Sequence, residues 1–200
     1  MTGSYILHIA THGFFAEVSP TLDEYGNGNS LSNRHAFPID FFENPMHCSG
    51  LALAGAQATL DAWRRNESPR QENNGIVTAE DISGVALGSC WLATLSACDT
   101  GLGRSEAGEG VFGLRRGFFK SGVQNLLFTL WRVLDVETVT IMKEFYGKAL
   151  TTGNAPQALA DTQRDSLLKL KANLGLAKAV NIAGPFILSF QGTFGARGEE

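Results

Sequence analysis

Cysteine is scarce in this sequence, which has only Cys48, Cys90 and Cys98 among its 200 residues. An odd and sparse set of this kind argues against a disulfide framework and indicates a reducing compartment. No apolar run approaches the roughly 20 residues that are needed to span a bilayer. The first residues also lack the charged and apolar segments of a signal peptide. We therefore expect a cytoplasmic protein that does not use a membrane as a partner.

Positive charge is scarce as well, with 16 Lys and Arg against 20 Asp and Glu, a net charge of −4. Without a basic block to neutralise phosphates, direct nucleic-acid binding has little support. The glycine-rich loops do not follow the P-loop pattern, and the spacing of His35, His47 and Cys48 fits no standard zinc site. These absences leave catalysis or protein binding as the functions to consider, and we expect no metal site.

The chain is long enough for one domain with a buried core. Its apolar content of 44% and charged content of 18% are ordinary for a globular protein. Apolar runs that read as buried strands occupy residues 5–11, 91–97, 123–131 and 186–190. Because these strands alternate with amphipathic helices, we predict an α/β fold with a mostly parallel central sheet and helices on both faces.

Capping residues and glycines mark the expected helices. Thr78 is a predicted N-cap, with Asp81 as the acid of a capping box, and Gly122 is suited to end the helix that opens near Gly108. Asp135 can cap a helix that ends at Gly153, and Asn154 can begin another toward Ala172, with Pro156 in its first turn. The buried stripe expected after Asp135 is Val136, Val139, Met142, Phe145, Tyr146 and Ala149. Residues 14–50 are expected to be irregular, 51–62 a short helix or a strand running into one, and 64–75 an exposed loop.

Two of the apolar runs stop abruptly at a reactive side chain, one at His12 and one at Cys98. Functional groups gather at the carboxyl ends of the strands in an open parallel sheet, so neighbouring strands would bring the two side chains to one crevice. A thiol with a pKa of about 8.5 is mostly protonated at neutral pH and benefits from an adjacent imidazole. His12 would then act as base and acid for the Cys98 nucleophile, and the N–H groups of Gly13 and Cys98 could form an oxyanion hole. A cysteine peptidase needs this constellation, and its chemistry requires no cofactor.

These segments belong to an ordered series that resembles the CHAT family, the caspase-like peptidases that are often fused to TPR repeats. The resemblance covers roughly residues 5–192, and its segments are 7–13, 49–56, 75–80, 95–103, 108–116, 130–133 and 145–146. It implies a caspase-like three-layer sandwich, a His12 and Cys98 dyad, and hydrolysis of peptide bonds. Because CHAT domains usually carry a further strand and helix before the histidine motif, we expect residues 1–200 to be a single CHAT domain without that piece, or part of a larger protein.

The main hypothesis is a cysteine endopeptidase that cleaves a protein or peptide partner at limited sites through an acyl-enzyme on Cys98. The resemblance implies a regulated protease, with an activating domain or partner protein such as a TPR or sensor domain, in bacterial signalling or defence. One alternative is a non-proteolytic peptide-interaction module, and another is a hydrolase or transferase that acts on small thioesters or amides. The retention of both His12 and Cys98 argues against the interaction module, whereas the hydrolase or transferase would use the same dyad.

Four further residues are candidates for substrate binding. The family more often has proline after the tryptophan of the segment that begins at Leu130, but here Arg132 follows Trp131. In related peptidases this segment lines the pocket for the residue before the scissile bond, so Arg132 would favour an acidic side chain, unless Asp135 neutralises it. Asp99 could contact substrate or cap its turn, and Trp131 could stack on substrate or fill the core.

The remaining reactive side chains have structural interpretations. His8 lies four residues before His12 on the same predicted strand, and the period of two puts both on one face. We expect His8 to be packed or to support the site, with metal ligation the less favoured alternative. Cys48 and Cys90 lack any surrounding motif and are expected to be structural.

Overall fold

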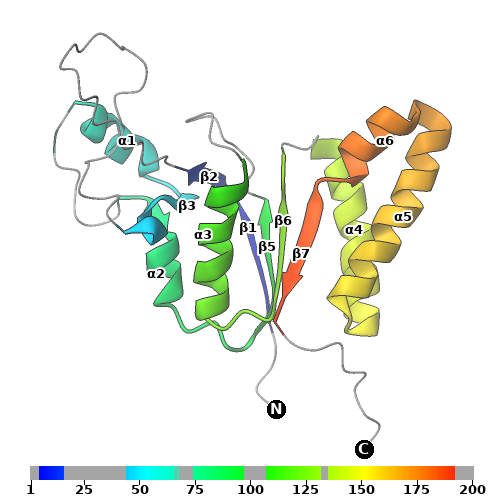
Figure 1. Cartoon of the computed structure of the whole chain (residues 1–200), viewed down its shortest axis with the longest axis horizontal. Coiled ribbons are helices and arrows are strands. Elements are labelled where there is room, and N and C mark those ends of the chain that lie inside the picture. The colour runs from blue at the N-terminus through cyan, green and yellow to red at the C-terminus, as the bar shows by residue number, and fades with distance from the viewer. Residues whose placement is uncertain are drawn as a thin grey trace, which may run out of the picture.

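The structure is a computed structural model, and it describes residues 5–15, 44–65, 67, 74–96, 107–131 and 135–191. Its centre is a four-stranded sheet with the order β1-β5-β6-β7 (Figure 1). Strands β1 (Tyr5–Ala10), β5 (Cys90–Ser96) and β6 (Asn125–Thr129) run parallel, and β7 (Phe186–Phe190) runs antiparallel to β6. The prediction of a mixed α/β fold with a mostly parallel sheet is therefore confirmed.

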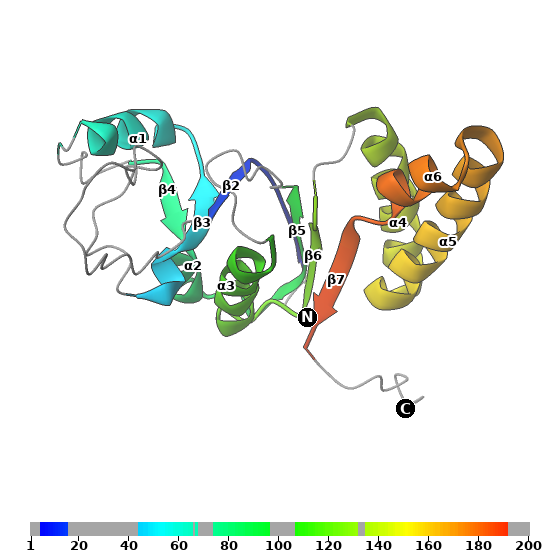
Figure 2. The same ribbon diagram turned by 45° about the horizontal axis from the view of Figure 1, so that its top comes forward.

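Helices cover both faces of this sheet. On one side lie α2 (Ala79–Ser83) and α3 (Ala107–Lys120), and on the other lie α4 (Asp135–Thr152), α5 (Ala155–Leu174) and α6 (Leu176–Ala183) (Figures 1 and 2). Successive residues of a strand point to opposite faces, so Leu126 joins the apolar cluster under α2 and α3, and Leu127 joins the one under α4 and α5. The central strands read as continuous apolar runs because both of their faces are buried.

A second sheet extends the first at the carboxyl end of β1. It contains β2 (His12–Phe15), β3 (Ser49–Ala52) and β4 (Ile76–Thr78), which pair antiparallel in that order. Helix α1 (Ala56–Arg64) packs on it through a small apolar cluster that includes Phe14, Leu60 and Ile76. The sequence did not predict this sheet, because strands of three or four residues carry no clear alternation. Residues 51–62 form the end of β3 followed by most of α1, which is the second of the two predicted forms. The expectation of irregular structure over 14–50 is wrong at both ends, where the end of β2 and the start of β3 lie.

Most predicted helix ends are confirmed. The Thr78 hydroxyl accepts the Asp81 N–H at 3.1 Å, and the Asp81 carboxylate accepts the Thr78 N–H at 2.8 Å, which completes the capping box. Gly122 and Gly153 have φ angles of +99° and +65°, in the left-handed region that favours glycine. Helix α6 was not predicted, and α5 runs on to Leu174.

The predicted stripe of α4 is wrong at Val139, whose side chain is 52% exposed. The residues of α4 that are buried against the sheet and α5 are Ile141, Met142, Phe145 and Ala149, and Tyr146 is half-buried. A helix that passes over a twisted sheet keeps only part of an apolar row in contact. The exposure of Val139 shows that the apolar row of α4 does not stay in contact with the core along its whole length, although the spacing of the apolar residues gives Val139 a place in that row.

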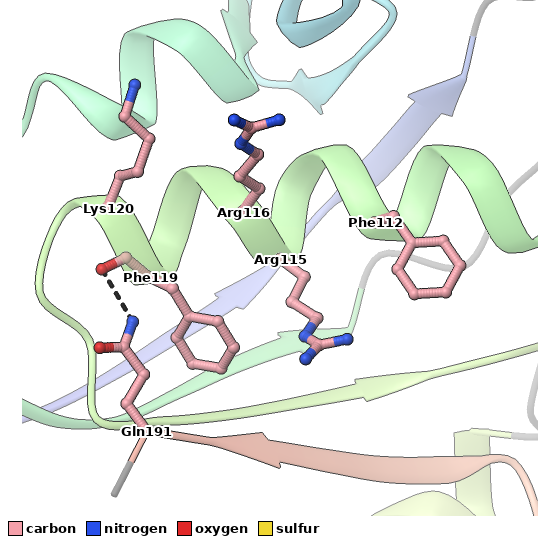
Figure 3. A pocket seen from close by; sticks show the side chains of 6 residues that line it. All are labelled: Phe112, Arg115, Arg116, Phe119, Lys120 and Gln191. Carbon is pink, nitrogen blue, oxygen red and sulfur yellow. Dashed lines mark hydrogen bonds between the residues drawn. The ribbon is translucent and has the colours of Figure 1, made fainter.

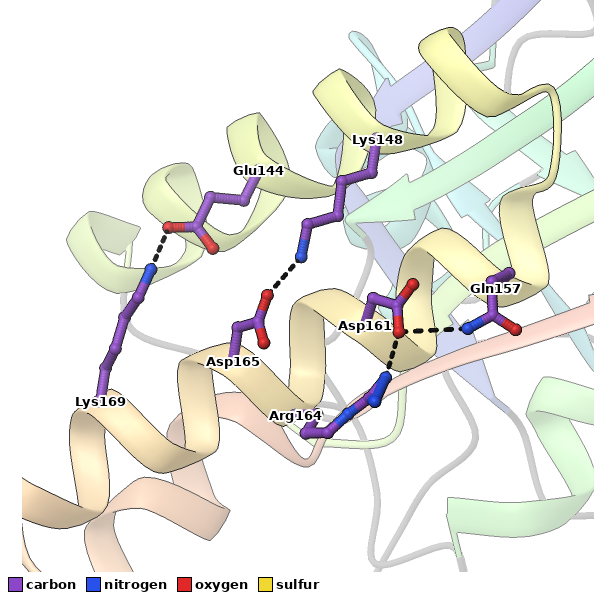
Figure 4. Close-up of polar contacts among 7 residues, drawn as sticks. All are labelled: Glu144, Lys148, Gln157, Asp161, Arg164, Asp165 and Lys169. Atoms are coloured by element: carbon purple, nitrogen blue, oxygen red, sulfur yellow. Dashed lines mark hydrogen bonds and ion pairs between the residues drawn. The ribbon is translucent and has the colours of Figure 1, made fainter.

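Ion pairs join the outer surfaces of α4 and α5 (Figure 4). Lys148 Nζ lies 2.7 Å from Asp165 Oδ2, and Lys169 Nζ lies 3.1 Å from Glu144 Oε1. A third pair, Arg164 with Asp161, lies within α5. All of these side chains are substantially exposed, and exposed pairs contribute little to stability. The apolar cluster beneath them is what holds the two helices on the sheet.

No helix in the part of the chain that the structure describes is both long enough and apolar enough to cross a membrane.

Candidate active site

The strands that lead to His12 and Cys98 are neighbours. Strand β1 pairs in parallel with β5, and Ala10 at the end of β1 lies opposite Ser96 at the end of β5. His12 and Cys98 each follow two residues later, so the chain reaches both positions from the same edge of the sheet. Cys98 itself lies outside the described residues, as do Asp99 and Arg132.

Strand β6 continues the same edge on the other side of β5. Its last residue is Thr129, and the exposed side chain of Trp131 follows after one more residue. The spatial order β1-β5-β6 therefore puts the strand that leads to Cys98 between the strand that leads to His12 and the strand that leads to Trp131 and Arg132. In parallel sheets such an edge is where functional side chains collect.

The second sheet fixes the backbone at His12. The chain bends at Thr11, and His12 begins β2 opposite Ala52 of β3. The Thr11 hydroxyl donates a hydrogen bond to the carbonyl of Ala52, which ties the bend to β3. The His12 side chain is exposed, and the next residue, Gly13, is buried opposite Leu51. The histidine therefore emerges from a paired strand.

The bend at Thr11 corrects one expectation. His8 and His12 do not share a strand face, because β1 ends at Ala10 and His12 belongs to a different sheet. A change of strand direction within a continuous run of extended residues leaves no signal in the hydrophobic pattern. The period of two could not be carried across it.

Trp131 is 40% exposed and is tied to α6. Its indole Nε1–H points at the carbonyl oxygen and the side-chain Oδ1 of Asn181, each at 3.1 Å. The ring is therefore partly exposed and not fully buried in the core, and its contact with substrate stays a prediction. Asp135 is the first residue of α4, and its side chain lies outside the described part of the structure, so its expected contact with Arg132 stays a prediction.

A hydrogen-bonded cluster that the sequence did not predict lies between these strand ends and α4. The hydroxyl of Tyr146 donates to Thr94 Oγ1 at 2.8 Å and lies 3.1 Å from His8 Nδ1, while His8 Nε2 lies 3.2 Å from Ser96 Oγ. Burial raises the pKa of Tyr146 above its ordinary value, although the hydrogen bond with Thr94 opposes the shift. The alternation of His8, Thr94 and Ser96 with apolar neighbours was the available signal, but it does not identify the partner on α4.

Neither of the other two cysteines has the character of a reactive thiol. Burial raises the pKa of both Cys48 and Cys90, whereas nucleophilic cysteines have a lowered pKa. Cys90 is fully buried at the start of β5. Among the described residues, no group of three or more His, Cys, Asp and Glu side chains is placed to hold a metal ion.

An open pocket on α3 lies away from the strand edge (Figure 3). Gln191, which follows β7, lines it, and the antiparallel pairing of β7 puts this residue beside the start of β6. Arg115 lies over the ring of Phe119, at 5.6 Å from the ring centre, while Arg116 and Lys120 point to the other side of the helix. The cations do not converge on one point, and Gln191 of the lining lies at the end of the sheet opposite to the candidate site.

Comparison with known proteins identifies the family. Neither the curated proteins nor the solved structures include a match to this chain. A sequence model of the CHAT domain, however, matches residues 1–177 of the 200. The match contains β1, β5 and β6 and therefore the whole strand edge described above. The chain belongs to the CHAT domain family.

Proposed function

We propose that this protein is a caspase-like cysteine endopeptidase in which Cys98 is the nucleophile and His12 the general base. One observation carries the proposal: β1 and β5 pair in parallel with Ala10 opposite Ser96, so the strands that lead to His12 and Cys98 end side by side. Membership of a caspase-like family supports it. The raised pKa values of Cys48 and Cys90 leave no comparable nucleophile among the described cysteines.

The reaction follows from these groups. His12 takes the proton of the Cys98 thiol, and the thiolate attacks the carbonyl carbon of the peptide bond. The N–H groups of Gly13 and Cys98 stabilise the oxyanion that forms. As the carbon–nitrogen bond breaks, His12 gives its proton to the leaving amine, and a thioester remains on Cys98. Water, activated by His12, then hydrolyses the thioester and restores the thiol.

The order of the strands supports a binding site for the residue before the scissile bond. Because β5 lies between β1 and β6, the strand that leads to the proposed nucleophile is flanked by the strand that leads to the proposed base and by the strand that leads to Trp131. The partly exposed ring of Trp131 offers an apolar wall there. Arg132 supplies a planar, permanently charged fork that matches a carboxylate, and the proposed preference is for acidic side chains.

The proposal extends to a regulated role. The substrate is a protein partner that is cut at limited sites, and an activating domain or partner protein, such as a TPR or sensor domain, switches the enzyme on. The setting is bacterial signalling or defence in the cytoplasm. These points come from the family and from the composition of the chain.

The first experiment is digestion of a diverse peptide library, read by mass spectrometry, with and without candidate activators. We expect cuts by the wild type that disappear in Cys98→Ala and His12→Ala. Cys48→Ala is the matched control, since this thiol is partly buried and its pKa is raised, and it should cut like the wild type. Cuts that persist in Cys98→Ala would contradict the proposal. If none of the proteins cleaves any peptide, and an electrophilic peptide does not label Cys98, a peptide-binding module is favoured instead.

The same library tests Arg132. In Arg132→Ala we expect kcat/KM for peptides cut after Asp or Glu to fall about tenfold or more, because a charge-assisted contact to the carboxylate is lost. Cleavage after neutral residues should change little. Arg116→Ala is the control, since Arg116 is an exposed arginine on α3 away from the strand edge. An acidic preference that survives unchanged in Arg132→Ala would exclude this role for the guanidinium.

A further inference from the structure

The cluster of His8, Thr94, Ser96 and Tyr146 joins three elements at one place. His8 lies opposite Thr94 in the pairing of β1 with β5, and Ser96 is two residues farther along β5 on the same face. Tyr146 reaches this face from α4, with its hydroxyl between Thr94 and His8. The cluster therefore fastens the last residues of β5 both to the neighbouring strand and to a helix.

The hydrogen bonds of the cluster can all be satisfied together. When the Tyr146 hydroxyl donates to Thr94, its oxygen can accept the Nδ1–H of His8, and His8 Nε2 is then free to accept the hydroxyl proton of Ser96. The rings of His8 and Tyr146 also lie against each other, with their centres 6.0 Å apart. Each side chain thus limits the movement of the next, from the buried Thr94 to the strand end at Ser96.

The cluster lies at the strand ends that lead to the two residues of the proposed dyad. Ser96 is the last residue of β5 and stands two residues before Cys98. It also lies opposite Ala10, two residues before His12. A rotation or slip of either strand end would change the distance between the two groups of the proposed dyad, and errors of about 1 Å are costly in such arrangements.

We propose that Tyr146 and His8 are positioning residues that hold Ser96, and with it the end of β5, so that Cys98 meets His12. This inference rests on the proposed function. The cluster acts through the strand and does not touch the substrate. Ser96, His8 and Tyr146 also have the spacing of a nucleophile, a base and an orienting group, so an alternative reaction at Ser96 is included in the test.

The experiment measures the rate at which iodoacetamide alkylates Cys98 at neutral pH, with peptide mapping to separate Cys98 from Cys48 and Cys90. This rate depends on the fraction of Cys98 that is present as thiolate, which His12 is proposed to raise, and the measurement requires no known substrate. The His12→Ala variant sets the rate without the dyad. In Tyr146→Phe and Ser96→Ala we expect the rate to fall about fivefold from wild type, which corresponds to the loss of one or two hydrogen bonds.

Matched variants separate positioning from a general loss of stability. Ser96→Thr keeps the hydroxyl and should restore the rate to within about twofold of wild type. Tyr5→Phe removes the hydroxyl of an exposed tyrosine at the start of β1, the strand that contains His8, and should leave the rate unchanged. A variant that is merely destabilised would not show rescue by Ser96→Thr, and failure of that rescue would overturn the inference.

The outcomes distinguish the inference from the proposed function. If wild type reacts faster than His12→Ala while Ser96→Ala and Tyr146→Phe match wild type, the dyad stands and the positioning role is wrong. If wild type reacts no faster than His12→Ala with the candidate activators present as well as absent, the dyad is not assembled and both proposals fall. If a fluorophosphonate probe labels Ser96 in wild type and not in His8→Ala, Ser96 is a nucleophile and the positioning role is again overturned.

Discussion

At the scale of single residues, the environment of Tyr146 makes stability depend on pH. Burial holds the pKa of this phenol above its ordinary value of 10.0, so the folded state keeps its proton at a pH where the unfolded chain loses it. The stability that this contributes is complete below about pH 10 and is lost as the pH rises toward the folded-state pKa. The buried thiol of Cys90 has a pKa that is raised from 9.0 by burial, so it adds a loss of the same sign that begins above about pH 9.

We therefore expect the free energy of unfolding to fall above about pH 10, by at most about 1.4 kcal/mol per pH unit for one proton. At neutral pH, Tyr146→Phe should be less stable than wild type by about 1 kcal/mol, because its hydrogen bonds are lost. That difference should narrow at alkaline pH, since the variant has no phenol to ionise there. Urea denaturation of wild type and Tyr146→Phe at about pH 8 and about pH 10.5 measures the free energy of unfolding of each protein and the difference between them. A constant difference between the two proteins would show that Tyr146 does not carry the dependence, and Tyr5→Phe controls for an exposed phenol.

At the scale of elements, the short helix α2 depends on its capping box. A helix of five residues has almost no internal hydrogen bonding, so the groups at its ends decide whether it forms. The Thr78 hydroxyl accepts the Asp81 N–H and donates to the Asp81 carboxylate, which also accepts the Thr78 N–H. Thr78→Ala should cost about 1 to 2 kcal/mol, whereas Thr78→Ser should restore most of it. Denaturant unfolding gives the loss, and faster amide exchange confined to residues 79–84 would locate it. Equal stability of Thr78→Ala and wild type would contradict the argument.

The capping box also shows what the sequence can predict. Thr78 and Asp81 are three residues apart, so their contact depends on local geometry alone. The strands of the central sheet can likewise be predicted, because each is a continuous apolar run. The pairing of β2, β3 and β4 joins segments that are far apart along the chain, and their alternation is too short to read. Distance along the chain also limits what can be predicted of the site. The strand ends near His12 and Cys98 can be predicted from the sequence, whereas the contact of His8 with Tyr146 joins residues 138 positions apart and cannot. The exposure of Val139 could not be predicted, because the pattern contains the spacing of a helix but not the extent of the surface that the helix packs against.

At the scale of the whole molecule, β5 and β6 link the two helical layers into one folding unit. Each strand sends alternate side chains into both apolar clusters, so neither cluster can be lost without exposing the strands that the other requires. Phe118 and Phe145 are the large side chains at the two centres, with exposures of 1% and 0%. The surface ion pairs between α4 and α5 are too exposed to stabilise one layer without the sheet.

Phe118→Ala and Phe145→Ala should therefore each cost about 3 to 5 kcal/mol, and both should lower a single transition of the described domain. Leu150→Ala on the outer side of α4, where the side chain is 63% exposed, should change the stability by less than about 0.5 kcal/mol. Far-ultraviolet circular dichroism and tryptophan fluorescence, followed through urea unfolding, should give coincident curves for every variant. Separate transitions in Phe145→Ala would mean that α4, α5 and α6 unfold on their own. Because β5 leads to the proposed nucleophile and lies between the two clusters, coincident unfolding would also mean that the end of β5 does not stay folded when either helical layer is lost.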